Sequence, residues 1–505
     1  MNFRRMIFWL TILLVFIMAA RVSLDTDTWW HLRAGEWIVE NRQLPTNDPF
    51  SFTRQNVVWK YPGWLIEVPM FWVYDRFGPG GLNIWVALMI AITFGFSYQA
   101  ASGSPLLRAF VTILAAISSS VYWSARPHLI TLLFTSITVF IFELENRRHD
   151  KKSGLLMMLG LPLMMLAWVN SHGGFIIGFI LWGVYFAGYI IEVLKRKKID
   201  KPERDEKNPV SGVDNRDITR RVVRYSIAGI GMLGLGLLNP LGFRIYLYPF
   251  QTVAIKSLQN YIQEWQSPNF HWSSTQPFLG LLILLIAALG FSKKKLDFKD
   301  FILISVFLYL ALTAARNLAL FAVIAPVILT RYLSEFLIFR TTFGNLNFAN
   351  EPTRQFSLRT QQWINWIIIT IVLMGAGYKA YMVYPLSINE EAFQKTLPVN
   401  AVTHLKNITD EGNMFNSYNW GGYLLWALPE RKVFIDGRTD LYNDEVIQEW
   451  LNVVQVKSDW EQVLKKWDIQ FILMERDWLG SEILLHYHWC REYQDQLAIL
   501  LRRCQ

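Results

Sequence analysis

Long apolar runs recur along most of the chain and stop before its C-terminal part. The first run follows the basic start MNFRR and extends from Met6 to Ala20. No small-residue cleavage site follows it, so we interpret it as an uncleaved transmembrane helix rather than a signal peptide. Together the runs predict about eleven spans. They lie at residues 6–20, 82–100, 106–124, 128–142, 154–169, 174–193, 222–238, 277–292, 299–315, 317–333 and 363–384.

The composition agrees with a chain that lies mostly in a bilayer. Of its 505 residues, 52% are hydrophobic and only 18% are charged, whereas soluble chains carry about a quarter charged residues. This balance excludes a secreted or cytosolic enzyme and a disordered scaffold. The net charge of +9 is read as a topology signal, because cytoplasmic loops of membrane proteins are rich in Lys and Arg. We therefore expect no nucleic-acid partner.

Charge also predicts the orientation of the chain. If the N-terminus is cytoplasmic, the connections on that side hold most of the Lys and Arg outside the C-terminal part, as the positive-inside rule requires. They lie around Arg108 and over residues 147–152, 195–224, 293–299 and 331–359. The longest cytoplasmic loop, residues 195–221, is polar and aperiodic and is predicted to be flexible.

The opposite side of the membrane then receives a long first loop, residues 23–81, and everything after residue 385. Within that loop, the short run at 64–74 contains Glu67 and Pro69 and is predicted to lie at the interface. We therefore divide the chain into a transmembrane domain, residues 1–384, and a soluble extracytoplasmic α/β domain, residues 385–505.

In the C-terminal domain, RKVFID and IQFILME are predicted to be buried strands, because both are short, apolar and rich in β-formers. EVIQEWLNVVQ and WEQVLKKW are predicted to be helices. The two cysteines, Cys490 and Cys504, could form one disulfide outside the cytoplasm. Two cysteines exclude a disulfide framework and a cysteine-based zinc site.

Polar residues gather at the outer ends of the predicted spans. Ionisable groups at membrane depth are costly and usually line a cavity or pathway. Cations there suit a phosphate or pyrophosphate, and carboxylates suit a general base or a divalent ion. The pattern predicts a site for a lipid-linked, phosphate-bearing substrate. The candidates are Asp25, Asp27, His31, Glu67, Arg126, His128, Asn170, His172, Asn239, Arg244, Arg316 and Asn317.

Several of these residues have a plainer interpretation. Asp27 also suits the N-cap of the following helix. Asp27 and His31 are four residues apart and could share a metal ion or only stabilise one helix face. The arginines could extend toward lipid headgroups, and Asn170 and Asn239 could cap or turn the chain. The loop at residues 436–440 could dock over the membrane site or form a turn with an internal Asp–Arg pair.

Two segments carry a resemblance to a known family. DTDTWWHLRAGEWIVENRQLPTNDPFSFT in the first loop and FNSYNWGGYLLWALPERKVFIDGRTDLYNDE in the C-terminal part resemble bacterial membrane proteins placed near the GT-C superfamily of polytopic glycosyltransferases. The layout of the whole chain is similar to that superfamily, which includes protein O-mannosyltransferases, aminoarabinose transferases and oligosaccharyltransferases.

The resemblance implies a membrane glycosyltransferase of the bacterial inner membrane. Its partners would be membrane lipid, a polyprenyl-phosphate sugar donor and a glycan, lipid or protein acceptor at the outer face. Asp25 or Asp27 matches the first-loop acid that activates the acceptor, although their Asp-x-Asp spacing differs from the adjacent acids often found there. The other candidates would bind substrate, with a divalent metal ion as an open option. Two alternatives are a transporter or flippase of a lipid-linked or anionic solute and a non-catalytic assembly protein; no inverted repeat supports the former.

Overall fold

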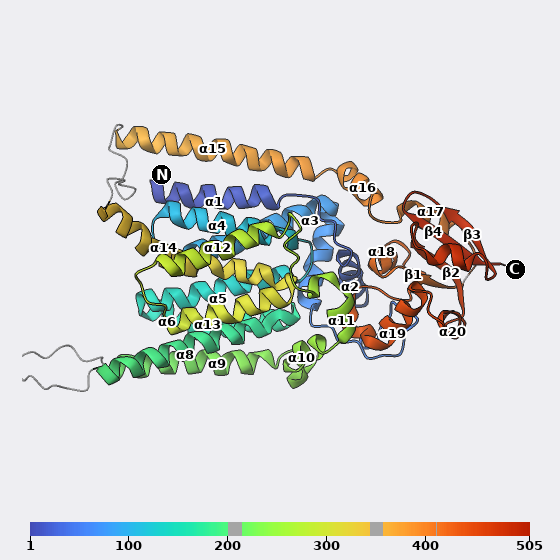
Figure 1. Cartoon of the computed structure of the whole chain (residues 1–505), viewed down its shortest axis with the longest axis horizontal. Helices are drawn as coiled ribbons and strands as arrows, with labels where there is room; N and C mark the ends of the chain where they lie inside the picture. Colours follow the sequence, from blue (N-terminus) through green and yellow to red (C-terminus); the bar gives the residue numbers. More distant parts are fainter. Residues whose placement is uncertain (200–214, 344–356, 411, 505) are drawn as a thin grey trace, which may run out of the picture.

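The chain forms a bundle of long helices with a small α/β domain beyond one end of it (Figure 1). This computed structural model describes residues 1–199, 215–343, 357–410 and 412–504. Residues 200–214 of the predicted loop 195–221 lie outside the described residues; its two ends, residues 195–199 and 215–221, are helical, so the predicted bounds of the loop are too wide. We call the end of the bundle that faces the α/β domain the domain end.

Each of the eleven predicted segments is helical. Seven helices among the described residues are long and apolar enough to cross a membrane, and Gln276–Phe291 is a shorter apolar helix. A mostly helical, multi-pass chain is thereby confirmed, while the count of eleven spans stays a prediction. The bundle helices are α1 (Phe3–Ala19), α3 (Trp64–Ala100), α4 (Pro105–Ser119), α5 (His128–Arg148), α6 (Lys151–Leu155), a π-helical turn (Leu156–Gly160), α7 (Leu161–Val169), α8 (Ile176–Ile199), α9 (Asn215–Gly236), α12 (Gln276–Phe291), α13 (Phe298–Thr313), α14 (Leu318–Phe343) and α15 (Leu358–Val383).

Local sequence fixes where these helices begin and break. The side chains of Asn2, Ser104 and Ser357 each accept a hydrogen bond from a first-turn backbone N–H, which is the preferred role of such residues at an N-cap. Helix α3 is divided at Gly78, where φ is 63°, and Pro79 follows. Glycine tolerates this conformation. The segment predicted at 64–74 is therefore the first arm of α3.

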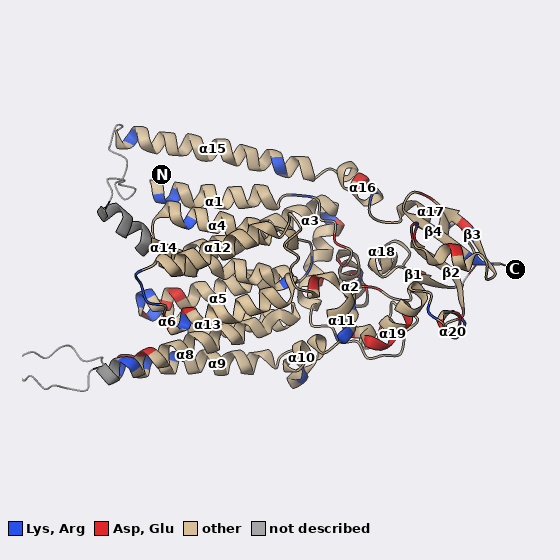
Figure 2. Ribbon diagram, in the orientation of Figure 1, with Lys and Arg blue, Asp and Glu red and all other residues tan. Residues whose placement is uncertain are grey.

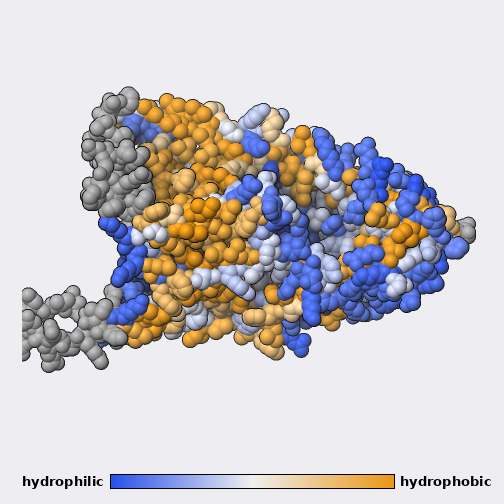
Figure 3. All heavy atoms as spheres, viewed as in Figure 1, coloured by the Kyte–Doolittle hydropathy of each residue, from blue (hydrophilic) through white to orange (hydrophobic). Residues whose placement is uncertain are grey.

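On the face shown in Figure 3, the surface of the bundle is mostly apolar and that of the α/β domain is mostly polar. Helix α15 lies at the edge of the bundle beside α1 (Figure 1). Its apolar side chains Trp363, Ile367 and Ile371 are exposed. They suit contact with lipid, and the helix also pairs its own backbone polar groups, as a lipid-facing segment requires.

A buried ion network joins the bundle helices away from the domain end. Glu143 of α5 lies 2.9 Å from Lys299 Nζ of α13 and 2.9 Å from Arg331 Nη2 of α14. Arg331 also pairs with Asp300, whose Oδ2 accepts a hydrogen bond of 2.8 Å from Tyr332. The charges of two carboxylates and two cationic side chains balance here, so the network links three helices.

Short helices connect the long ones at the domain end. The first loop contains α2 (Thr28–Asn41). The other connections hold 3-10 turns and short α-helices. These are η1 (Ser120–Tyr122), η3 (Gly173–Phe175), η4 (Gly242–Tyr246), α10 (Tyr248–Val253), α11 (Lys256–Tyr261), η5 (Gln263–Trp265) and η6 (Ala315–Asn317).

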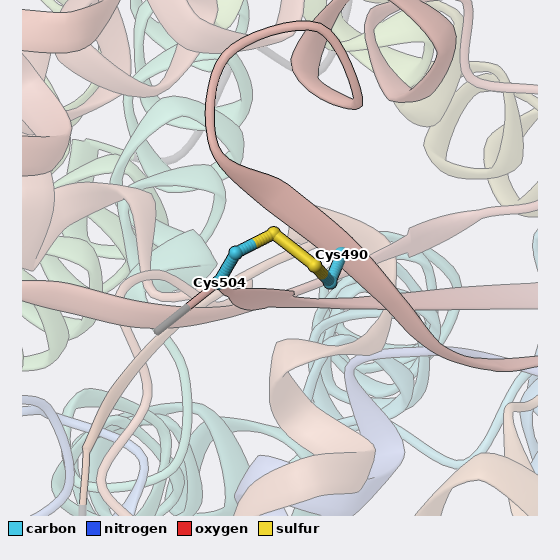
Figure 4. Close-up of a disulfide and its surroundings, with 2 residues drawn as sticks. All are labelled: Cys490 and Cys504. Atoms are coloured by element: carbon cyan, nitrogen blue, oxygen red, sulfur yellow. A yellow bond between two sulfur atoms is a disulfide. The ribbon is translucent and has the colours of Figure 1, made fainter.

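The α/β domain is built on a four-stranded sheet of order β1-β2-β4-β3. β1 (Asn413–Asn416) runs parallel to β2 (Ile469–Glu475), and β4 (Ala498–Arg503) pairs antiparallel with both β2 and β3 (Trp489–Gln494). A disulfide between Cys490 and Cys504 ties β3 to the residue after β4 (Figure 4). The helices of this part are α16 (Leu386–Gln394), α17 (Val399–Lys406), α18 (Tyr418–Ala427), α19 (Thr439–Val454), α20 (Trp460–Lys466) and α21 (Gly480–Leu484).

IQFILME forms β2, and the two predicted helices fall in α19 and α20. RKVFID, predicted to be a strand, is instead an extended segment with isolated bridges. Its backbone is paired by other groups: Val433 N–H donates to Phe50 O at 3.2 Å, and Phe434 N–H donates to the Asn416 side chain at 2.9 Å. The segment therefore connects the first loop to the sheet rather than extending a ladder.

Candidate functional site

Three carboxylates surround the guanidinium of Arg126 at the domain end of the bundle. Arg126 Nη1 lies 2.8 Å from Asp27 Oδ2, Nη2 lies 2.9 Å from Glu264 Oε2, and Nε lies 3.5 Å from Asp25 Oδ2. Only 13% of the Arg126 side chain is exposed. Two of the acids come from the first loop and one comes from η5. The side chain of Arg126 thus joins these two distant stretches of the chain to the connection before α5.

Arg316 extends this group on its other side. Its Nη1 lies 3.0 Å from Glu264 Oε1, and its guanidinium stacks 4.6 Å from the ring centre of Trp265. Glu264 thus bridges the two arginines. We call Asp25, Asp27, Arg126, Glu264 and Arg316 the Arg126 cluster. Arg316 is 24% exposed and pairs with one acid, whereas all three nitrogen positions of Arg126 face acids.

The carboxylates of the cluster differ in their readiness to take a proton. Burial raises the pKa of Asp27 to about 7; the Arg126 charge opposes this rise, while the Asp25 and Glu264 charges add to it. Burial would also raise the pKa of Glu264, but the guanidiniums of Arg126 and Arg316 hold it at about 2. Asp27 is therefore the acid suited to proton transfer near neutral pH.

The backbone of the first loop orients the carboxylate of Asp27 toward Arg126. Asp27 occupies the N-cap position of α2, yet its side chain makes no capping hydrogen bond. Its own N–H donates to Asp25 Oδ1 at 2.9 Å. The capping interpretation thus explains the position of Asp27 in the chain but not the direction of its carboxylate.

His172 lies near the arginines as a neutral imidazole. Its Nδ1 accepts a hydrogen bond from Gly174 N–H at 3.1 Å and lies 2.7 Å from Thr131 Oγ1, so its proton is on Nε2. Burial lowers the pKa of His172 well below its usual value, and the Arg316 charge lowers it further. His128 Nε2 donates to Tyr122 O at 2.7 Å, and no described residue pairs with its buried Nδ1.

His31 pairs with Glu67 rather than with Asp27. His31 Nδ1 lies 2.8 Å from Glu67 Oε1, and both side chains are buried. Asp27 in turn pairs with Arg126. Within the described ranges, no group of three or more His, Cys, Asp or Glu side chains is arranged to hold a metal ion.

Four other candidates lie outside the Arg126 cluster. Asn170 Oδ1 accepts hydrogen bonds from Trp64 Nε1 at 2.9 Å and from Asn239 Nδ2 at 3.1 Å, so both amides fasten turns. Arg244 is exposed. Asn317 Nδ2 donates to Leu310 O at 3.2 Å across a helix end.

A loop of the α/β domain closes over the acids. A Cβ atom added at Gly437 would overlap Asp27 Oδ1. The neighbouring Arg438 is fully buried between Asp436 Oδ2 at 2.6 Å and Asp48 Oδ1 at 2.5 Å, and it lies 4.7 Å from the ring centre of Trp59. Residues 436–440 thus contain an internal Asp–Arg pair and also dock on the first loop.

A pocket of about 220 Å³ lies behind the His31–Glu67 pair. Its lining includes the aromatic side chains of Trp59, Tyr61 and Trp64 together with Glu67. The structure thus places Glu67 in the wall of this pocket and not among the partners of Arg126.

Sequence reasoning missed Glu264 and Gly437. Glu264 is the only acidic residue between 239 and 276, in a loop that the predicted topology puts on the same side of the membrane as the first-loop acids. That isolation was an available signal. Gly437 had no comparable signal, because its role comes from close packing against a residue 410 positions earlier in the chain.

No family model matches the chain, and no curated protein matches it. Solved structures do. The archaeal oligosaccharyltransferase AglB from Archaeoglobus fulgidus, in complex with an inhibitory peptide and a dolichol-phosphate, is 12% identical over 94% of this chain and 70% of its own, with a TM-score of 0.56. An Archaeoglobus fulgidus oligosaccharyltransferase, tethered with an acceptor peptide containing the NVT sequon via a disulfide bond, is 13% identical over 98% of this chain and 74% of its own, with a TM-score of 0.53.

A third structure, ArnT from Cupriavidus metallidurans bound to undecaprenyl phosphate, is 12% identical over 98% of this chain and 97% of its own, with a TM-score of 0.49. At such identities the likeness concerns the fold. The two Archaeoglobus fulgidus matches cover 94% and 98% of this chain, and they therefore include most of the helical bundle and most of the α/β domain. The chain therefore has the GT-C fold of polytopic membrane glycosyltransferases, as its first loop and C-terminal part predicted.

Proposed function

We propose that the protein is a membrane glycosyltransferase that moves a sugar from a polyprenyl-phosphate-linked donor to an acceptor. The observation that carries this proposal is the Arg126 cluster: a carboxyl group, Asp27, whose pKa is raised to about 7, beside two arginines at one end of a GT-C bundle. Related folds were solved with dolichol-phosphate and with undecaprenyl phosphate.

In this reaction Asp27 accepts the proton of the acceptor nucleophile. The nucleophile forms a bond to the anomeric carbon of the donor sugar, and the bond between that carbon and the phosphate oxygen breaks. The polyprenyl phosphate leaves with the bonding electron pair. Arg316, which pairs with one acid, stabilises the charge on the departing phosphate. His172, with its proton on Nε2, supplies a neutral donor nearby.

The reaction takes place at the outer face of a bacterial inner membrane, with the N-terminus in the cytoplasm and the α/β domain outside. Two features support this orientation. Lys and Arg gather at the end of the bundle away from the α/β domain (Figure 2), as the positive-inside rule expects of the cytoplasmic side. The Cys490–Cys504 disulfide lies in the α/β domain, and disulfides persist in oxidising compartments outside the cytoplasm.

The test is release of polyprenyl phosphate in lipid nanodiscs. Purified protein is incubated with lipid-linked sugars extracted from bacterial membranes, with and without an envelope glycan fraction as acceptor, and the lipids are analysed by mass spectrometry. We expect acceptor-dependent loss of the sugar from the lipid, abolished by Asp27→Asn and retained by Arg244→Gln. Transbilayer movement of intact donor without sugar release would identify a flippase instead. No change in the donor and no movement would favour the assembly protein.

A further inference from the structure

We propose that Arg126 is the resident cation of this site: its guanidinium occupies the space between Asp25, Asp27 and Glu264 that a divalent metal ion would need, so the site operates without such an ion. A corollary is that removing the Arg126 side chain converts the three carboxylates into a metal site. The part of this inference that concerns transfer rests on the proposed function, whereas the metal-binding part does not.

The contacts of Arg126 with the three acids differ from those of a bound divalent ion. A divalent ion draws its ligand oxygens to within about 2.0–2.6 Å of one point. The three acids instead meet three different nitrogens of a planar group, at 2.8, 2.9 and 3.5 Å. Their oxygens are therefore spread around the guanidinium, and no metal-holding group of three such residues forms anywhere in the described part of the chain.

Hydrogen bonds fix the backbone next to Arg126 against the first loop. Ala125 N–H donates to Ser23 Oγ at 2.9 Å, and Thr28 Oγ1 donates to Ala125 O at 3.0 Å. Ser23 precedes Asp25 and Thr28 follows Asp27. Ala125 is therefore hydrogen-bonded to the first loop on both sides of its two acids. Arg126 is thus held against the first loop and is not a side chain that reaches freely toward lipid headgroups.

Arg126 balances the charge of the two first-loop acids. The cluster holds three carboxyl groups and two guanidiniums, and Arg316 contacts only Glu264 among the acids. Asp25 and Asp27 therefore depend on Arg126 for their compensating charge. Without Arg126 the like charges repel one another unless a small cation replaces it. It follows that Arg126 positions and neutralises the acids, which leaves Arg316 to meet a phosphate.

The experiment is an electron paramagnetic resonance titration with Mn²⁺ on EDTA-treated, full-length protein in zwitterionic nanodiscs. We expect the wild type to show no specific Mn²⁺ site. Arg126→Ser binds one equivalent of Mn²⁺, at least roughly tenfold more tightly than the nonspecific binding of the wild type, and the double variant Arg126→Ser/Glu264→Gln loses this site. Arg316→Ser serves as the matched control, since it also removes one cluster arginine but leaves Arg126 in place.

The wild-type titration decides the proposal even if Arg126→Ser does not fold alone. One specific Mn²⁺ per wild-type protein, lost in Glu264→Gln, would overturn it. A folded Arg126→Ser protein that gains no Mn²⁺ site would overturn it as well. If the variant folds only with Mn²⁺ present, its melting temperature rises with Mn²⁺ concentration, which is the expected result. These readouts need no transfer activity, so failure of the proposed function is observed separately.

Discussion

Gly437 of the α/β domain lies directly against the carboxylate of Asp27, and a Cβ atom at position 437 would overlap Asp27 Oδ1. The acid of the first loop is therefore enclosed by a loop from the far end of the sequence. The α/β domain forms part of the wall of the site and is more than an appended module. This relationship makes Gly437 a position that is sensitive to substitution.

Gly437→Ala should lower transfer at least roughly tenfold, because small displacements of a reacting group are costly in catalysis. The new methyl group has no space unless Asp27 moves away from its place beside Arg126. Polyprenyl phosphate release measures the effect. Gly377→Ala in α15 is the control, since its added Cβ meets no atom within 4 Å. Equal activity of both variants would show that the position of Asp27 is not critical.

Transfer by the wild type should decline as the pH falls below about 7. The pKa of Asp27 is raised to about 7, and a protonated carboxyl group cannot accept the proton of the acceptor. The rate should therefore fall about tenfold per pH unit on the acid side. A series of initial rates between pH 5 and 9 measures this profile.

Asp25→Asn distinguishes the two first-loop acids. The Asp25 charge helps to raise the pKa of Asp27, so removing it should move the acid limb of the profile to lower pH while transfer persists. Asp27→Asn should abolish transfer at every pH. The reverse pattern, with Asp25→Asn inactive and Asp27→Asn active, would make Asp25 the base.

The sequence was most informative where membrane physics restricts polar residues. Asp27, Arg126 and Arg316 could be selected because ionisable groups at span ends are costly, and the structure brings all three together. The same criterion also selected Asn170 and Asn239, whose side chains are hydrogen-bonded to each other. An amide that links two turns stands at the end of a span, just as an amide that binds substrate would.

Long-range packing accounts for what could not be predicted. Glu264 becomes part of the cluster because η5 lies against Arg126; its isolation in the connection from 239 to 276 marks it as unusual but does not indicate which residue it meets. Similarly, RKVFID has the composition of a strand. Its ladder is replaced by the side chain of Asn416 and by the first loop, both of which are distant in sequence.

Arg316→Gln should weaken use of the donor more than it lowers stability. Loss of a charge-assisted hydrogen bond costs about 1.5–3 kcal/mol, which corresponds to a roughly 10- to 100-fold loss in kcat/KM for the donor. Arg244→Gln is the matched control, since Arg244 is exposed and lies outside the Arg126 cluster. Donor titrations of both variants give the comparison. A larger effect of Arg244→Gln would place the phosphate at the membrane surface near η4.

Arg438→Met should release the α/β domain from the first loop. Arg438 is fully buried between Asp48 and Asp436, and removing one partner of a buried ion pair costs about 3–5 kcal/mol because the remaining charges are left uncompensated. Limited proteolysis should then cut the C-terminal part while the bundle stays intact, and transfer should fall because Gly437 no longer encloses Asp27.

The control for this change is Arg502→Gln. Arg502 pairs with Asp410 at the surface, where the two side chains are 33% and 52% exposed, and such pairs contribute about 0–1 kcal/mol. Protease resistance and transfer should both be nearly unchanged in that variant. Suppose instead that Arg438→Met resists proteolysis as the wild type does but loses transfer. The ion pair would then serve the chemistry of the acid site directly. Docking of the domain would rest on other hydrogen bonds, from Val433 N–H to the first loop and from Thr53 Oγ1 to the extended segment.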